Sequence, residues 1–139
     1  MKRDLFEGLA MYHLTALVTL LAIAFYFFTA VNVSRLRTKT GVKVPAMAGH
    51  PDFDRAFRIQ TNTLEWMPIF LPALWLFAAY IGDAMAAGIG AVWIIGRIVY
   101  FIGYSQAAAK RGTGFAIQVL AALVLWVGAL GAVVLRLVK

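Results

Sequence analysis

The sequence predicts an all-α integral membrane protein, in which four transmembrane helices form an up-and-down bundle. Hydrophobic residues fill 63% of the 139 positions and charged residues only 14%, a balance that is unusual for a soluble domain. Four stretches are apolar and long enough to cross about 30 Å of hydrocarbon at about 1.5 Å per residue. They lie at about residues 8–34, 59–82, 84–109 and 112–135.

Individual features of the sequence support the predicted helices and their arrangement. The stretch 8–34 is too long for a cleaved signal and lacks a small-residue cleavage site, so we expect a retained helix. The second contains Pro68 and Pro72, which remove backbone donors and predict a bend just beyond Glu65. Short second and third connections make the last three helices antiparallel neighbours, and one domain, 1–139, accounts for the chain.

The first connection, about 35–58, is the only long one, and its glycines and prolines predict a loop at the edge of the bundle. Basic residues concentrate in the first and third connections, whereas the second offers only Asp83. The positive-inside tendency therefore places the first and third connections in the cytoplasm and both termini outside. The basic residues are Arg35, Arg37, Lys39, Lys43 and Arg55 in the first connection, and Lys110 and Arg111 in the third.

Several kinds of chemistry are disfavoured by composition. Without cysteine, the chain has no thiolate nucleophile and no cysteine metal site, so any thiol chemistry must use a sulfur of the substrate. The spacing of His13 and His50 supports no metal site, and we expect no metal. Although the net charge is +7, no basic stripe interleaved with aromatics points to a nucleic-acid partner.

A polar stripe runs through the start of the second helix, in the segment FDRAFRIQTNTLEWMPIF. At about 100° per residue, Arg58, Asn62 and Glu65 return to one helical face. Ionisable residues inside membrane helices are expensive and usually face a bundle interior or a wet cavity, which makes them functional candidates. The structural alternative is an intramembrane ion pair that holds the bundle together.

A second stripe follows the third helix, at Arg97, Tyr100, Tyr104 and Arg111. These residues share one face, provided that the helix continues as far as Arg111. On antiparallel helices the two stripes meet near the cytoplasmic side, around a polar ligand. Structural and binding roles are equally open for Arg97, and the tyrosines alone would also fit interfacial aromatics.

The segments FDRAFRIQTNTLEWMPIF and GRIVYFIGYSQAAAKR together resemble the MAPEG superfamily, the membrane-associated proteins of eicosanoid and glutathione metabolism. The likeness covers nearly the whole chain in length and span count, and it is closest to the glutathione-transferase and leukotriene-forming members, with this chain as a bacterial one. The resemblance implies a homotrimer that binds glutathione between neighbouring subunits. It also implies an arginine that stabilises the glutathione thiolate.

Residue by residue, Arg111 matches the thiolate-stabilising arginine, and Tyr100 is the second catalytic candidate through its hydroxyl. Trp66 stands where the leukotriene-forming relatives usually have tyrosine, and it cannot donate a phenolic hydroxyl. Gln60 and Arg35 match positions that the adjacent subunit supplies, and Arg37 is the alternative to Arg35. The full set that matches glutathione-binding positions is Arg35, Arg58, Gln60, Asn62, Glu65, Trp66, Tyr100, Tyr104 and Arg111.

The resemblance therefore implies a glutathione transferase that conjugates glutathione to hydrophobic electrophiles arriving from the bilayer, with glutathione peroxidase activity on lipid hydroperoxides as a further expectation. In a bacterium it would lie in the inner membrane with its glutathione site toward the cytoplasm. The alternative is a non-catalytic protein of the same superfamily that binds lipid or fatty acid. A small transporter is disfavoured because the chain shows no internal repeat.

Overall fold

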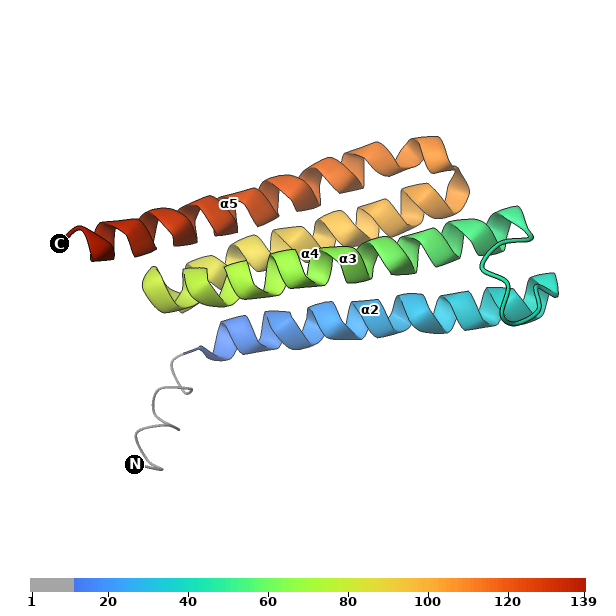
Figure 1. Ribbon diagram of the computed structural model, residues 1–139, viewed down its shortest axis with the longest axis horizontal. Helices are drawn as coiled ribbons and strands as arrows, with labels where there is room; N and C mark the ends of the chain where they lie inside the picture. Colours follow the sequence, from blue (N-terminus) through green and yellow to red (C-terminus); the bar gives the residue numbers. More distant parts are fainter. Residues whose placement is uncertain (1–11) are drawn as a thin grey trace, which may run out of the picture.

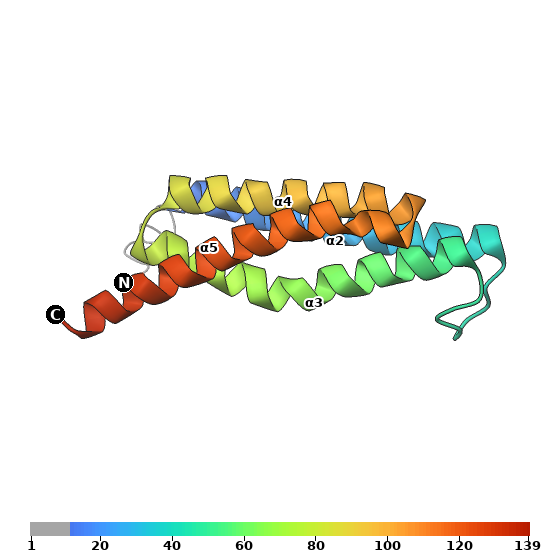
Figure 2. The same cartoon turned by 90° about the horizontal axis from the view of Figure 1, so that it is seen from above.

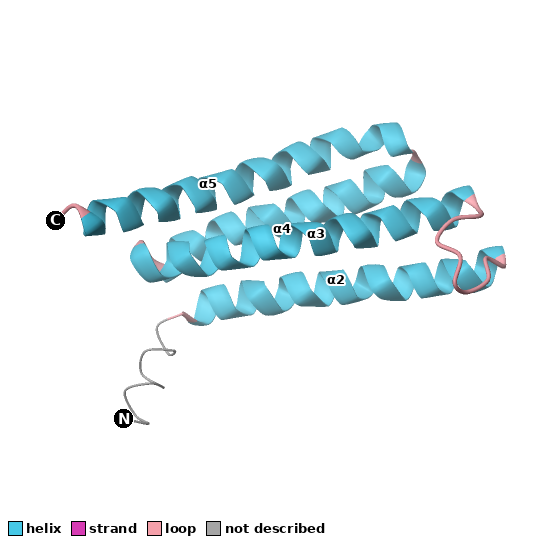
Figure 3. Ribbon diagram, in the orientation of Figure 1, coloured by secondary structure: helices cyan, strands magenta, loops and turns pink. Residues whose placement is uncertain are grey.

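The computed structural model describes residues 12–139, and within them the chain is helical apart from short connections (Figure 3). Four long helices, α2 (His13–Thr40), α3 (Pro51–Tyr80), α4 (Asp83–Gln106) and α5 (Gly112–Leu137), run up and down beside one another (Figure 1). A short 3-10 helix, η1 (Ala108–Arg111), joins α4 to α5. The predicted start of the first span, at about residue 8, lies outside the described residues.

The described helices are long and apolar enough to cross a membrane, by length and composition. Their outward faces carry large exposed apolar side chains, such as Leu20, Phe27, Ile95 and Leu120. Exposing such apolar faces to water costs free energy, whereas contact with lipid does not. The protein is therefore an integral, multi-pass membrane protein, and its residues 12–139 form a four-helix bundle.

The interior of the bundle is closely packed. The ring of Phe70 in α3 stacks on Trp93 in α4, with centroids 3.9 Å apart. The backbones of α4 and α5 approach each other closely at Gly114. A Cβ atom at this position would lie 2.1 Å from the backbone nitrogen of Tyr100. Only glycine permits that approach, which holds Tyr100 against the first turn of α5.

The first connection is shorter than predicted. We expected a loop over about 35–58, but α2 continues to Thr40 and α3 already begins at Pro51. The loss of hydrophobicity near Arg35 marks where the chain turns polar, whereas the helix ends at Thr40 because the next residue, Gly41, adopts a left-handed conformation with φ 74°. The loop of residues 41–50 is held in place, since Arg37 Nη1 donates to the Ala46 carbonyl at 2.8 Å.

Two features of the chain path position the site. The α2–α3 loop and the α4–α5 turn lie at one end of the bundle, and the α3–α4 turn lies at the other (Figure 1). Part-way along its length α3 changes direction (Figure 2), and Pro68 and Pro72 lie in its interior, as the sequence predicted. At the far end, the Asp83 carboxylate accepts hydrogen bonds from the backbone nitrogens of Leu14 and Thr15, which ties α4 to the start of α2.

Candidate functional site

A pocket of about 290 Å³ opens between α3, α4 and the start of α5, toward the end of the bundle that carries the α2–α3 loop. Of the residues predicted for the site, five line this pocket together. The lining residues are Arg58, Asn62, Tyr100, Tyr104, Arg111, Gly112 and Phe115. We call this space the arginine pocket.

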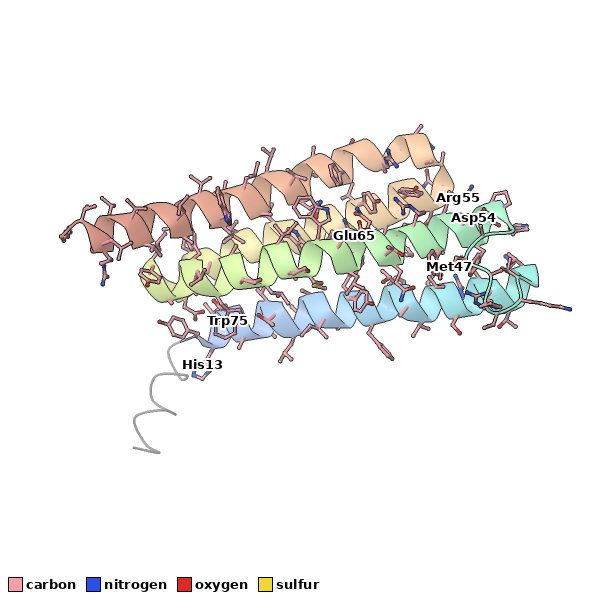
Figure 4. All side chains as sticks on the ribbon, viewed as in Figure 1. His13, Met47, Asp54, Arg55, Glu65 and Trp75 are labelled. Atoms are coloured by element: carbon pink, nitrogen blue, oxygen red, sulfur yellow. The ribbon has the colours of Figure 1, made fainter. Side chains whose placement is uncertain are left out.

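Helix α3 contributes its polar stripe to the arginine pocket. Arg58 is exposed and Asn62 half-buried on the same face, one turn apart. Asn62 Nδ2 donates to Glu65 Oε2 at 3.4 Å, so the stripe continues to Glu65, which is exposed and does not itself line the pocket. In Figure 4, Glu65 lies along the bundle between Arg55 at the loop end and Trp75 at the far end.

Helix α4 and the turn that follows it supply the aromatic and basic wall. The rings of Tyr100 and Tyr104, both buried, have centroids 5.4 Å apart. The assumption that the helix continues to Arg111 is wrong, because α4 ends at Gln106 where Ala107 takes an extended conformation. The 3-10 helix nevertheless places the Arg111 guanidinium 5.7 Å from the ring centroid of Tyr104.

The arginine pocket is positively charged. Its lining includes two arginines and no carboxylate, and both Arg58 and Arg111 are exposed. An arginine fork is well suited to bind a carboxylate, and a nearby guanidinium favours the anionic form of a thiol. On its apolar side Phe115 packs edge-on against Trp66, with centroids 5.8 Å apart. The pocket therefore suits an anion that also carries apolar groups.

Arg35 lies elsewhere, in a second pocket of about 300 Å³ beside α2, which we call the α2 pocket. Arg35 Nη2 donates to Asn32 Oδ1 at 3.0 Å. Arg37 instead lies over the ring of Phe53 and donates to the loop, and it does not line the α2 pocket. The α2 pocket is lined by Asn32, Arg35, Leu36, Asp52, Ala56, Phe101 and Ser105.

The sequence did not identify every residue at these pockets. Gln60, which was predicted, is half-buried and lines neither pocket, whereas Phe115 and Asn32 were not predicted and line one each. Phe115 lies one turn beyond Arg111, but an apolar residue in an apolar span gives no contrast by which to recognise it. Among residues 12–139, no group of three His, Asp or Glu side chains is arranged to hold a metal ion.

Comparison with known proteins decides the family. The model of the MAPEG family matches residues 15–131. The chain belongs to the MAPEG family. This confirms the assignment made from the polar stripes.

Three relatives illustrate the range of the similarity to this MAPEG protein. An uncharacterized protein of Synechocystis sp. is 52% identical over 115 residues, which cover 83% of this chain and 84% of that protein. Microsomal glutathione S-transferase 2 of Homo sapiens is 42% identical over 119 residues, 85% of this chain and 81% of the human protein. Leukotriene C4 synthase of Cavia porcellus is 37% identical over 98 residues, 70% and 65% of the two chains.

Proposed function

We propose that this protein is a membrane glutathione transferase, which conjugates the thiolate of glutathione to hydrophobic electrophiles. The observation that carries the proposal is the arginine pocket, where Arg58, Asn62, Tyr100 and Arg111 meet in a positively charged space inside a membrane bundle. The names of the human and Cavia relatives, a glutathione transferase and a leukotriene C4 synthase, support the same reading.

The chemistry of glutathione suggests a role for each residue. The tripeptide carries two carboxylates, an ammonium and a thiol, and Arg58 is suited to a carboxylate through its planar fork. Glu65 is suited to the ammonium. A free thiol has a pKa of about 8.5, and a guanidinium beside it favours the thiolate near neutral pH. We assign that role to Arg111, with the Tyr100 hydroxyl as a second hydrogen-bond donor to sulfur.

The reaction joins the thiolate sulfur to an electrophilic carbon, either by opening a strained ring or by displacing a leaving group. The apolar outer faces of the helices give a hydrophobic electrophile a route to the pocket from the bilayer. With a lipid hydroperoxide the same thiolate supports a peroxidase reaction. In that reaction two glutathione molecules are oxidised to their disulfide, and the hydroperoxide is reduced to an alcohol and water.

We further propose a homotrimer in which glutathione lies between neighbouring subunits, with Arg35 and Gln60 supplied by the neighbour. The separation of Arg35 from the arginine pocket within one chain supports this arrangement. The basic first and third connections favour the cytoplasmic side for this end of the bundle, in the inner membrane of a bacterial cell.

The test adds glutathione to the purified protein in detergent and records the thiolate absorbance together with the heat of binding. We expect both signals, because the pocket favours the thiolate. S-methylglutathione is the matched control, since it keeps both carboxylates but has no ionisable thiol, and it should bind without the absorbance change. Binding of fatty acid with no glutathione signal would favour the non-catalytic alternative, and no binding of glutathione would contradict the proposal.

Glu65→Gln is expected to weaken glutathione binding about tenfold, because the ammonium loses a charged hydrogen-bond partner. Glutamine keeps the shape of the side chain and an acceptor for Asn62 Nδ2, so the melting temperature should change by no more than a few degrees. Calorimetry and thermal unfolding separate the two effects. A variant that binds glutathione like the wild type but melts much earlier would support the structural ion-pair reading.

A further inference from the structure

Arg97 is the most deeply buried charge near the site. Its side chain has no exposed surface, and no carboxylate among residues 12–139 lies within salt-bridge distance of it. An unpaired guanidinium inside a bundle is costly unless its donors are satisfied. Its Nη1 and Nη2 atoms have partners, whereas Nε has none among residues 12–139. The partners of Nη1 and Nη2 indicate what Arg97 does.

Those partners belong to α3 and to the next turn of α4. Arg97 Nη1 donates to Asn62 Oδ1 at 2.9 Å, and Nη2 donates to Thr63 Oγ1 at 2.5 Å. The Cζ atom of Arg97 lies over the Tyr100 ring, 4.3 Å from its centroid. Asn62 and Tyr100 line the arginine pocket, whereas Arg97 does not. Arg97 thus lies directly behind the pocket wall.

The network leaves Asn62 a single orientation. Arg97 can only donate, so it takes the amide oxygen of Asn62, and the Glu65 carboxylate can only accept, so it takes the amide nitrogen at 3.4 Å. A flipped amide would face a donor with its nitrogen and an acceptor with its oxygen. The two charged neighbours therefore fix which atoms Asn62 offers to a ligand.

Thr63 anchors the other arm of the fork. Its hydroxyl donates to the Ile59 carbonyl at 2.7 Å, which leaves the hydroxyl oxygen free to accept from Arg97 Nη2. With one arm fixed on α3 through Thr63, the second arm is held on Asn62. A lysine carries the same charge but has no planar fork, so it cannot reproduce both bonds with the same geometry.

We infer that Arg97 is a positioning residue of the glutathione site, which acts through Asn62 by fixing the orientation of its amide. This inference rests on the proposed function. Arg97 does not touch the ligand, and its effect falls on glutathione binding and not on the chemical step. A residue that merely stabilised the bundle would change the melting temperature and leave the affinity of folded protein unchanged.

The test compares Arg97→Met and Arg97→Lys with wild type, using trimer-sized protein selected by gel filtration. We expect the Kd for glutathione to rise about tenfold in Arg97→Met, and kcat at saturating glutathione to stay within about threefold. Arg97→Lys should rescue little of the affinity. If Arg97→Met does not assemble, Arg97→Lys carries the test, because it preserves the buried charge and removes only the fork.

A double-mutant cycle with Asn62→Ala tests whether Arg97 acts through Asn62. Once Asn62 is removed, Arg97→Met should raise the Kd by less than about twofold, because the group it positions is gone. The matched control is Trp75→Phe, which deletes the 3.0 Å bond from Trp75 Nε1 to Thr19 Oγ1 at the far end of the bundle (Figure 4). It should lower stability and leave the Kd unchanged.

The outcomes separate the two proposals. Glutathione binding by wild type with an unchanged Kd in both Arg97 variants would overturn the positioning role alone. Equal effects of Arg97→Met with and without Asn62 would do the same, since they would place its action elsewhere. Failure of wild type to bind glutathione at all would overturn the proposed function, and this inference with it.

Discussion

Arg111→Ala is expected to lower turnover about 100- to 1000-fold while changing glutathione affinity by less than about threefold. The reason lies in where the charge is needed. Arg111 is exposed at the arginine pocket, with its guanidinium held 5.7 Å from the Tyr104 ring centroid, so it is free to face a sulfur anion. In the proposed site, other groups such as Arg58 remain to hold the carboxylates.

Stopped-flow absorbance measures ionisation of the thiol and turnover separately, because the thiolate absorbs before the reaction and the conjugation product forms during it. Lys110→Ala is the matched control. Lys110 is the adjacent cation in sequence, but its Nζ donates to Gln106 Oε1 at 3.0 Å and it does not line the arginine pocket. It should retain wild-type turnover. Normal thiolate formation and turnover in Arg111→Ala would show that another group activates the sulfur.

The parts of the site that were predictable follow from helical geometry alone. Arg58 and Asn62 come to one face of α3 because the helix repeats about every 3.6 residues, whatever surrounds it. Tyr100 and Tyr104 share a face of α4 for the same reason. Antiparallel packing through short connections then brings the two faces together. Their meeting in one pocket needed no knowledge of side-chain contacts.

The parts that were not predictable depend on packing between helices. The hydrogen-bond partners of Arg97 could not be predicted, because either a neighbouring side chain or a ligand can accept from a buried guanidinium. The sequence does not show that Thr63 lies within hydrogen-bond distance of it. The ends of α2 and α3 were misplaced because hydrophobicity reports where the lipid ends, while the helices extend beyond it. Arg111 lies at the site because it ends a 3-10 helix, and the α-helical repeat used for the prediction does not apply to a 3-10 helix.

Within one chain, the predicted ligands divide between two places. Arg111 lines the arginine pocket against α5, and Arg35 lines the α2 pocket. The two lining sets share no residue, and α2 and α5 lie at opposite edges of the bundle (Figure 1). In the proposed trimer, one glutathione molecule reaches both arginines if the α2 pocket of one subunit faces the arginine pocket of the next. A closed ring of three subunits repeats that contact three times.

Mixed trimers of Arg111→Ala and Arg35→Ala subunits are therefore expected to regain activity that neither parent has. A three-membered ring that contains both subunits always has one interface carrying both defects and one carrying neither. Random assembly makes about three quarters of the trimers mixed, and once purification on both tags leaves only mixed trimers, about a third of their sites should be intact. Co-expression with two affinity tags, tandem purification and native mass spectrometry establish the composition. Turnover is measured below saturating glutathione, where loss of Arg35 has its full effect.

The matched control mixes Arg111→Ala with Arg58→Ala, because both residues line the same arginine pocket. Every arginine pocket in those trimers keeps one defect, so no intact site forms and activity should stay at the level of the parents. Recovery with Arg35→Ala but not with Arg58→Ala requires a site that two chains build together. Equal activity in both mixtures, with mixed composition established and the Arg35→Ala parent shown to be defective, would instead mean that Arg35 and Arg111 of a single chain serve the same glutathione.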